Sequence, residues 1–179
     1  MITNWNTSPR FVRVLRRTTL NWPAVALFVF LLTLTLPAQD ARPSGFEQWT
    51  AKSFAPVVTD LASEAPNDPH RFAVRQLADY PNDGFLLVHR AADGAVEWHE
   101  TQADVFFVQS GTATLLIGGK LVHGETVGPH EKRNGSIIGG VRRKMSAGDV
   151  VRIPPRVPHQ VLLEGAPAFD YLVVKVKGY

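Results

Sequence analysis

Apolar and polar residues alternate with a period of two along most of the chain after residue 70. Such alternation predicts half-buried β-strands, because successive side chains of a strand point to opposite faces. Turn-forming pairs interrupt the pattern every eight to twelve residues, among them Asp93-Gly94, Ser110-Gly111 and Glu164-Gly165. The runs between the turns are FLLVHR, AVEWHE, DVFFVQS, TATLLIGG, VRRKM, VVRIP, HQVLL and DYLVVKV. Eight or more short strands of this kind predict an all-β sandwich or barrel.

The segment before these strands, residues 39–69, follows a helical pattern instead. Its large apolar residues recur at helical spacing: Phe46, Trp49, Phe54, Val57, Val58 and Leu61. Ser44 and Glu47 have the spacing of a capping box, so the pattern predicts one amphipathic helix from about residue 45 to 63. We expect its aromatic face to pack against the rest of the domain and not to hold a cofactor.

One stretch, residues 121–140, has little apolar periodicity and is predicted to be a long loop. Loops of this length in a compact domain are usually functional or mobile. His123, His130 and the charged run 131–133 then form part of a flap over the mouth of the barrel, or a solvated charged loop.

The first 38 residues have the order of an export signal. Arg10, Arg13, Arg16 and Arg17 precede the apolar run 24–36, and Ala38 offers a small residue for cleavage. This order predicts a signal peptide and a periplasmic or secreted protein that starts near residue 39. Two alternatives stay open: residues 22–37 are retained as a membrane anchor, or the apolar run is a buried core helix.

The charge of the chain changes once this segment is set aside. Residues 1–38 hold four of the 19 basic residues and none of the 16 acidic ones, so residues 39–179 carry a formal charge of −1. A basic isoelectric point that comes from a signal peptide is no sign of nucleic-acid binding, and we expect no nucleic-acid partner. The chain has no cysteine, which excludes disulfides and thiolate metal sites.

Candidate chemistry gathers in residues 97–104. In a strand Glu97 and His99 point to one face, because residues two apart share a face. Asp104 heads the run in which Phe106 and Val108 share its face. An acid on an otherwise apolar face is costly to bury unless it is paired or binds a ligand.

Two stretches around these residues resemble the motifs of the cupin superfamily. His99-x4-Asp104-x6-Gly111 resembles the first motif, and Gly148-x5-Pro154-x-Arg156-x2-His159 is similar to the second. The sequence departs from the motifs at several positions: Glu97 stands for a histidine, Asp104 for a glutamate, Arg156 for a glycine and Leu163 for an asparagine, and Gly94 lies closer to the motif than usual. The resemblance implies a small jelly-roll β-barrel, a cupin of the type-2 conserved barrel kind, over residues 70–179. The chain resembles the small secreted single-domain cupins of bacteria.

The resemblance implies a mononuclear metal site whose ligands are Glu97, His99, Asp104 and His159. Two imidazoles and two carboxylates suit manganese or iron ahead of zinc or nickel. The other interpretation is a hydrogen-bonded polar cluster without metal, although two acids and two histidines in an apolar interior are hard to desolvate without a cation. His89 is expected to be a satisfied core histidine.

Cupins include enzymes and binding proteins, so the resemblance leaves the function open. The first expectation is a metal-dependent enzyme of oxygenase, isomerase or lyase type that acts on a small polar molecule. In it, Glu97 is either a metal ligand or a catalytic general base. The alternatives are a non-catalytic cupin that binds a small ligand or metal, and a metal-free module whose interior is filled. The expected partners are a small-molecule ligand and a second copy of the chain, and a membrane only if the first segment is uncleaved.

Overall fold

The structure is a computed structural model that describes residues 42–179. The predicted signal peptide, its cleavage near residue 38 and the anchor over residues 22–37 lie outside the described residues. No helix within residues 42–179 is long and apolar enough to cross a membrane. Residues 47–179 form one compact unit by their contacts, separate from the residues up to Phe46.

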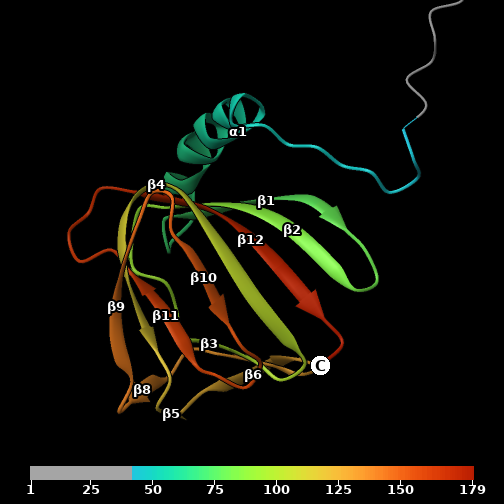
Figure 1. Cartoon of the computed structure of the whole chain (residues 1–179). Helices are drawn as coiled ribbons and strands as arrows, with labels where there is room; N and C mark the ends of the chain where they lie inside the picture. The colour runs from blue at the N-terminus through green and yellow to red at the C-terminus, as the bar shows by residue number, and fades with distance from the viewer. Residues whose placement is uncertain (1–41) are drawn as a thin grey trace, which may run out of the picture. The chain divides into compact units, whose positions relative to one another are not determined.

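The strands of this unit form a strongly curled sheet (Figure 1). They are β1 Phe72–Asp79, β2 Asp83–Arg90, β3 Glu97–His99, β4 Gln102–Ile117, β5 Lys120–Val122, β6 Glu125–Gly128, β7 Glu131–Arg133, β8 Ser136–Ile138, β9 Val141–Ser146, β10 Val150–Ile153, β11 His159–Leu162 and β12 Phe169–Lys177. Their order is β1-β2-β12-β4-β11-β3-β7-β6, with β9 and β10 also paired to β4, and β5 pairs with β8 alone. The predicted all-β fold is therefore confirmed.

The longest strand, β4, joins the two halves of the curled sheet. Its first half pairs with β12 and β10, and its second half pairs with β9 and β11. The sequence wrongly predicted a turn at Ser110-Gly111 between two separate strands. Gly111 has φ +78°, and a Cβ there would lie 2.3 Å from the Ala168 carbonyl oxygen. Because the strand has hydrogen-bonded partners on both sides of this position, the glycine bends the chain instead of reversing it.

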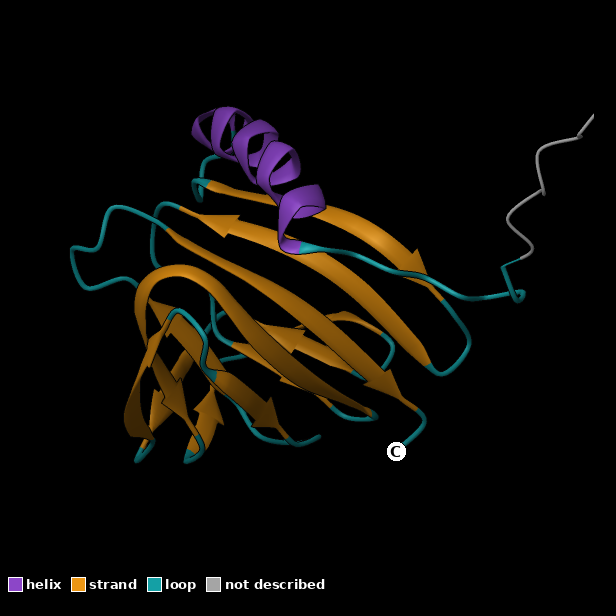
Figure 2. Cartoon of the chain, turned by 45° about the horizontal axis from the view of Figure 1, so that its top comes forward, coloured by secondary structure: helices purple, strands orange, loops and turns teal. Residues whose placement is uncertain are grey.

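Within residues 42–179 there is one α-helix, α1 Ala51–Glu64, followed by the 3-10 turn Ala65–Asn67; it precedes β1 and packs on one face of the sheet (Figure 2). It begins later than predicted, and residues 42–50 come before it. Thr50 is the N-cap and forms a capping box with Ser53, whereas Gly45 has φ +77°, which a helix does not admit. Trp49 fits the helical spacing but lies before the helix, where its ring packs on Phe85, so its inclusion made the predicted helix begin too early.

The prediction of a long loop over residues 121–140 is also wrong, because most of these residues lie in β-strands. They contain β6, β7 and β8, together with the end of β5. Strand β7 pairs with both β3 and β6, so this region extends the main sheet beside the strand that carries Glu97 and His99. Asn134 and Gly135 both have positive φ, at 64° and 74°, a turn signal that the periodicity does not detect.

The core fills the inside of the curled sheet. Its buried members include Phe106, Leu115, Ile153, Phe169 and Tyr171. A second, smaller cluster lies on the outer face, where Leu61 of α1 packs with Leu87. The inner core surrounds the candidate site, so the site is built on paired strands and not on free loops.

Candidate metal centre

The structure brings the four predicted ligand residues to one point inside the curled sheet. One ligand atom from each of Glu97, His99, Asp104 and His159 lies within 4.8 Å of all the others. The first two come from β3, Asp104 from β4 and His159 from β11, where it is paired with Glu97. His99, Asp104 and His159 are buried, and Glu97 is half-buried. Their convergence is observed, and metal binding by them stays a prediction.

His159 is delivered to the cluster by the proline-rich bend before β11. Its Nδ1 lies 3.1 Å from the carbonyl oxygen of Val157. A carbonyl oxygen only accepts hydrogen bonds, so Nδ1 carries the proton and a neutral His159 presents the lone pair of Nε2. That Nε2 is buried, has no hydrogen-bond partner and lies 3.5 Å from Asp104 Oδ2. Such an outer hydrogen bond is the arrangement that orients metal-binding histidines.

His99 has a similar orientation. Its Nε2 lies 3.4 Å from Asp104 Oδ2 and 3.5 Å from Glu97 Oε2, while its Nδ1 faces Glu131 Oε1 at 3.9 Å. Burial lowers the pKa of His99, but the hydrogen bonds to Asp104 and Glu97 outweigh it, and the pKa is raised. Both imidazoles therefore turn Nε2 to the cluster and Nδ1 to an oxygen acceptor.

The structure adds a residue that the sequence interpretation missed, Lys175 of β12. Its Nζ lies 3.0 Å from Asp104 Oδ2, 2.9 Å from Asp104 Oδ1 and 3.2 Å from His99 Nε2. The sequence held a signal for it, because Lys175 follows Tyr171 and Val173 at spacing two and must share their inward face. The ammonium group of Lys175 thus lies within hydrogen-bonding distance of two of the four predicted ligands, Asp104 and His99.

Two arginines that the sequence interpretation missed lie against Glu97. Arg90 and Arg133 each have a guanidinium nitrogen 3.5 Å from Glu97 Oε1. Arg90 is buried, donates to the Tyr171 hydroxyl at 2.9 Å and lies over the Phe72 ring. Arg133 donates to Glu131 Oε1, so β7 contributes both a cation and an anion to the site.

These cations keep the buried carboxylates ionised. Burial raises the pKa of Glu97, but the hydrogen bond to His99 and the charges of Arg133 and Lys175 lower it to about 2. Burial also raises the pKa of Asp104, but His99 and Lys175 hold it well below its usual range. The expectation that the acids need an external cation was therefore too strong, because Lys175, Arg90 and Arg133 already match the charges of Glu97, Asp104 and Glu131.

Even so, the cluster leaves polar atoms without partners. Among the described residues, His99 Nδ1, Asp104 Oδ1 and His159 Nε2 are buried and make no hydrogen bond. Asp104 Oδ1 still has an ion-pair partner, because Lys175 Nζ lies 2.9 Å from it. Buried polar atoms of this kind are rare and call for an unseen partner such as an ion or water. The donor set of two imidazoles and two carboxylates fits a divalent metal ion.

Two small cavities border the cluster. One of about 70 Å³ is lined by Glu97, Asp104, Phe106, Arg133 and Lys175, among others. The second, of about 80 Å³, is lined in part by Phe72, Arg90 and again Glu97 and Arg133. Each has room for water beside the ligands. The interior is therefore not completely filled, although Phe106, Val108, Val161 and Leu163 are all buried in it.

The other histidines singled out in the sequence lie apart from this site. His89 bonds Asp170 Oδ1 through Nδ1 at 2.7 Å, as expected of a satisfied core histidine. His130 pairs with Glu100 at 2.7 Å on the surface. His123 lines a different groove, on the other side of β3.

Neither a protein-family model nor a curated protein matches the chain. Several solved structures are similar to it. A double-stranded β-helix protein from Klebsiella pneumoniae shares 17% identity over 60% of this chain and 77% of its own, with a TM-score of 0.45. A Cupin 2 conserved barrel domain protein from Salinispora arenicola shares 20% identity over 60% and 77%, with a TM-score of 0.41. The DMSP lyase DddQ from Ruegeria pomeroyi shares 18% identity over 59% and 46%, with a TM-score of 0.43. These structural neighbours are cupin and double-stranded β-helix proteins, the kind of protein whose motifs the sequence resembles. At identities of 20% or less and TM-scores below 0.5, the likeness assigns neither a family nor an activity to this chain.

Proposed function

We propose that the protein binds one divalent metal ion through Glu97, His99, Asp104 and His159 and uses it to act on a small polar molecule. The observation that supports this most directly is the buried, unpartnered Nε2 of His159, which faces three further ligand atoms within 4.8 Å. A buried nitrogen lone pair with no donor nearby is costly in a structural cluster but is what a metal ligand needs. Manganese or iron fits the mixed donor set better than zinc or nickel.

A metal ion held here would act as a Lewis acid that polarises an oxygen of the bound small molecule. The chain's own residues would define where that molecule lies, because Arg133 and Lys175 border the cavity next to Asp104. Glu97 fits the role of a metal ligand better than that of a general base. A carboxyl with a pKa near 2 is a weak base at neutral pH, whereas general bases are most effective with a pKa near the working pH.

A second candidate is a cupin that binds a small ligand without metal and without turnover. Lys175 supports it, because its ammonium already lies where a metal ion would contact Asp104 and His99. In this case the cluster is a charge-balanced lining for a small polar ligand. The two candidate functions differ in the cation beside Asp104, which is a metal ion in the first and the Lys175 ammonium in the second.

Elemental analysis of the protein, purified without a histidine tag, separates the candidates. The protein is then stripped with a chelator and titrated with Mn²⁺, Fe²⁺, Zn²⁺ and Ni²⁺ by calorimetry and thermal unfolding. We expect about one ion per chain and a metal-dependent rise in Tm, because an ion that binds the folded state stabilises it. The His159→Ala variant is expected to lose both, and His130→Ala to keep both. A metal-free protein that none of these ions stabilises would support the second candidate.

We also propose that the protein is exported and that its mature form starts near residue 39. The support is the order of arginines, apolar run and small residue in the first 38 residues. Mass spectrometry of the protein from a cell-envelope fraction measures its start. An intact Met1 in a cytosolic fraction would contradict the proposal.

A further inference from the structure

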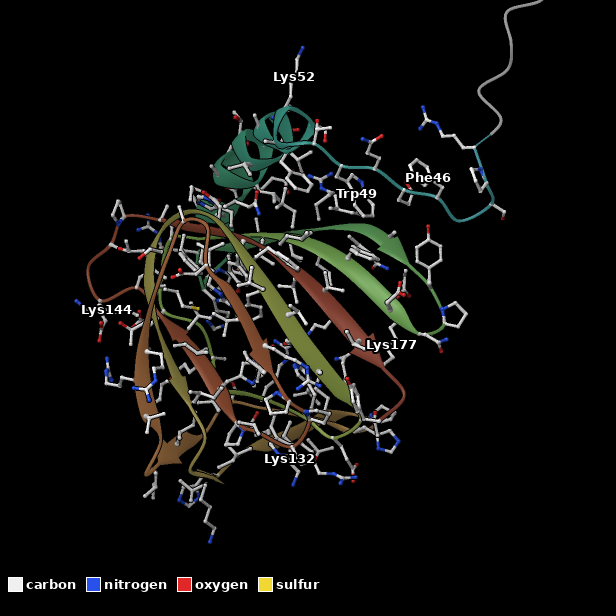
Figure 3. The ribbon with its side chains drawn as sticks, viewed as in Figure 1. Phe46, Trp49, Lys52, Lys132, Lys144 and Lys177 are labelled. Carbon is white, nitrogen blue, oxygen red and sulfur yellow. The ribbon has the colours of Figure 1, made fainter. Side chains whose placement is uncertain are left out.

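A separate groove lies on the face of β3 opposite to the metal cluster. Trp98 points into it, because it alternates with Glu97 and His99 along the strand. The groove has a volume of about 430 Å³, and its lining includes Trp98, Lys120, Leu121, His123, Lys132 and Arg156. That volume falls in the range of about 300–1,000 Å³ that is typical of small-molecule sites. Figure 3 shows Lys132 at the end of the sheet far from helix α1.

The groove is lined by positively charged side chains, although residues 39–179 as a whole carry no net positive charge. Lys120, Lys132 and Arg156 contribute three cations, and none of the described residues that line it is acidic. Residues 39–179 as a whole carry a formal charge of −1, so this concentration of positive charge does not reflect composition. Glu100, which follows β3, does not line the groove; it is paired with His130, and the charges of Arg156 and Lys132 also help to lower its pKa. The Lys132 ammonium lies 5.3 Å from the centre of the Trp98 ring, which places charge beside an apolar wall.

Two lining residues hold a backbone conformation that favours glycine. Arg156 has φ +63° and His123 has φ +55°. A residue with a Cβ pays a conformational cost there that glycine would avoid. The backbone N–H of Arg156 donates to the His99 carbonyl at 2.7 Å, which fixes its position behind the metal cluster. The same conformation occurs at four described residues outside the groove, Arg71, His130, Asn134 and Glu164, so it fixes these two side chains in place but does not by itself mark a site.

We propose that this groove is a binding site for a small organic anion with a carboxylate or phosphate group. The lysines and Arg156 provide charge-assisted hydrogen bonds to the anionic group, and Trp98 provides an apolar surface for the rest of the molecule. The site is distinct from the metal cluster, which uses the opposite face of β3, and it does not depend on metal binding.

Calorimetric titration of the full chain with glucuronate, glucose 6-phosphate and neutral glucose tests the site. We expect at least one of the two anions to bind and glucose not to bind. Affinity should fall as salt is raised, because the contacts are between charges at the surface. The anion that binds more tightly identifies the preferred group, carboxylate or phosphate.

A matched pair of double variants locates the binding. The double variant Lys120→Gln with Lys132→Gln removes two charges from the groove. We expect its affinity for the anion to fall by at least about tenfold, because charge-assisted hydrogen bonds are lost. Arg143→Gln with Lys144→Gln removes the same charge from exposed β9, outside the groove, and should bind as the wild type does. Circular dichroism checks that each variant is folded. Equal losses in the two double variants, equal binding of glucose, or no binding of either anion by the wild type would overturn the proposal.

Discussion

Two polar clusters lie on opposite faces of the curled sheet, and they differ in how fully their atoms are paired. On the outer face, Asp170 of β12 lies opposite His89 of β2 and Ser110 of β4. His89 and Asp170 alternate with the strand positions that face the core, and share their face with Leu87 and Leu172, which pack near α1. Ser110 joins them because the pairing of β12 with β4 shifts register next to Asp170. His89 Nδ1 bonds one oxygen of Asp170, and the Ser110 hydroxyl donates to the other.

On the inner face, Asp104 and His159 are just as buried but are less well partnered. Three buried atoms of the inner cluster make no hydrogen bond, whereas neither oxygen of Asp170 is left alone. A satisfied polar cluster rigidifies a fold, and an unsatisfied one has a cost unless something binds it. Burial and residue type therefore do not separate a structural cluster from a binding site, but unpaired atoms do.

The sharpest test of this difference replaces a histidine in each cluster. His159→Ala and His99→Ala should each weaken metal binding by at least about 100-fold, since removing even an outer-shell partner costs about 10–100-fold. His123→Ala and His130→Ala, which lie outside the cluster, should keep the wild-type affinity. Calorimetric titration of the chelator-stripped protein measures this. If all four variants bind metal equally well, the ion is held elsewhere.

The matching change in the outer cluster should affect stability and leave metal binding intact. His89→Ala leaves the buried Asp170 carboxylate with one partner fewer, and we expect a loss of about 2 kcal/mol in the free energy of unfolding. Urea unfolding measures the loss, and metal titration of the same variant provides the control. A loss of metal with His89→Ala would show that the two faces are coupled and that the ligand set is wrongly assigned.

The Lys175 ammonium group lies where a metal ion would contact Asp104 and His99, so the two cations would compete for these residues. Removal of its ammonium in Lys175→Met frees Asp104 and His99, so metal affinity should rise by about tenfold, the equivalent of one charge-assisted hydrogen bond. The metal-free protein should become less stable, because Asp104 loses its nearest cation. Lys177→Met is the matched control on the same strand, since Lys177 pairs with Asp79 instead. A stability loss without any metal binding in Lys175→Met would favour the metal-free candidate.

Local pattern was enough to predict the fold class, and the family resemblance was needed to predict the four clustered residues. Alternation of period two located most strands that form the core, whereas the resemblance to the cupin motifs is what named Glu97, His99, Asp104 and His159 as one set. The same alternation, carried one step further along β2 and β12, also puts Arg90 and Lys175 on the inner face. These two residues were within reach of the sequence.

Other features depend on contacts between distant parts of the chain. Strand β1 escaped the pattern because its pairing with β2 shifts register between Gln76 and Ala78, which breaks the alternation. The strands within residues 120–138 are three or four residues long, too short for any periodicity. Glu131 and Arg133 reach the site only because β7 pairs with β3, and no local pattern predicts that pairing.

The smallest effect expected is that of Glu131, which faces the candidate metal site on the Nδ1 side of His99. Its Oε1 lies 3.9 Å from His99 Nδ1, longer than a direct hydrogen bond, so it orients the imidazole weakly. Glu131→Gln keeps an oxygen that accepts from Arg133 but removes the charge, and metal affinity should fall by less than about tenfold, the low end for an outer-shell partner. Glu100→Gln is the control, because it removes the same charge from the residue that follows His99 and pairs with His130 at the surface. Equal losses in the two variants, measured by competition with a chelator, would mean that Glu131 acts through its charge alone and does not position His99.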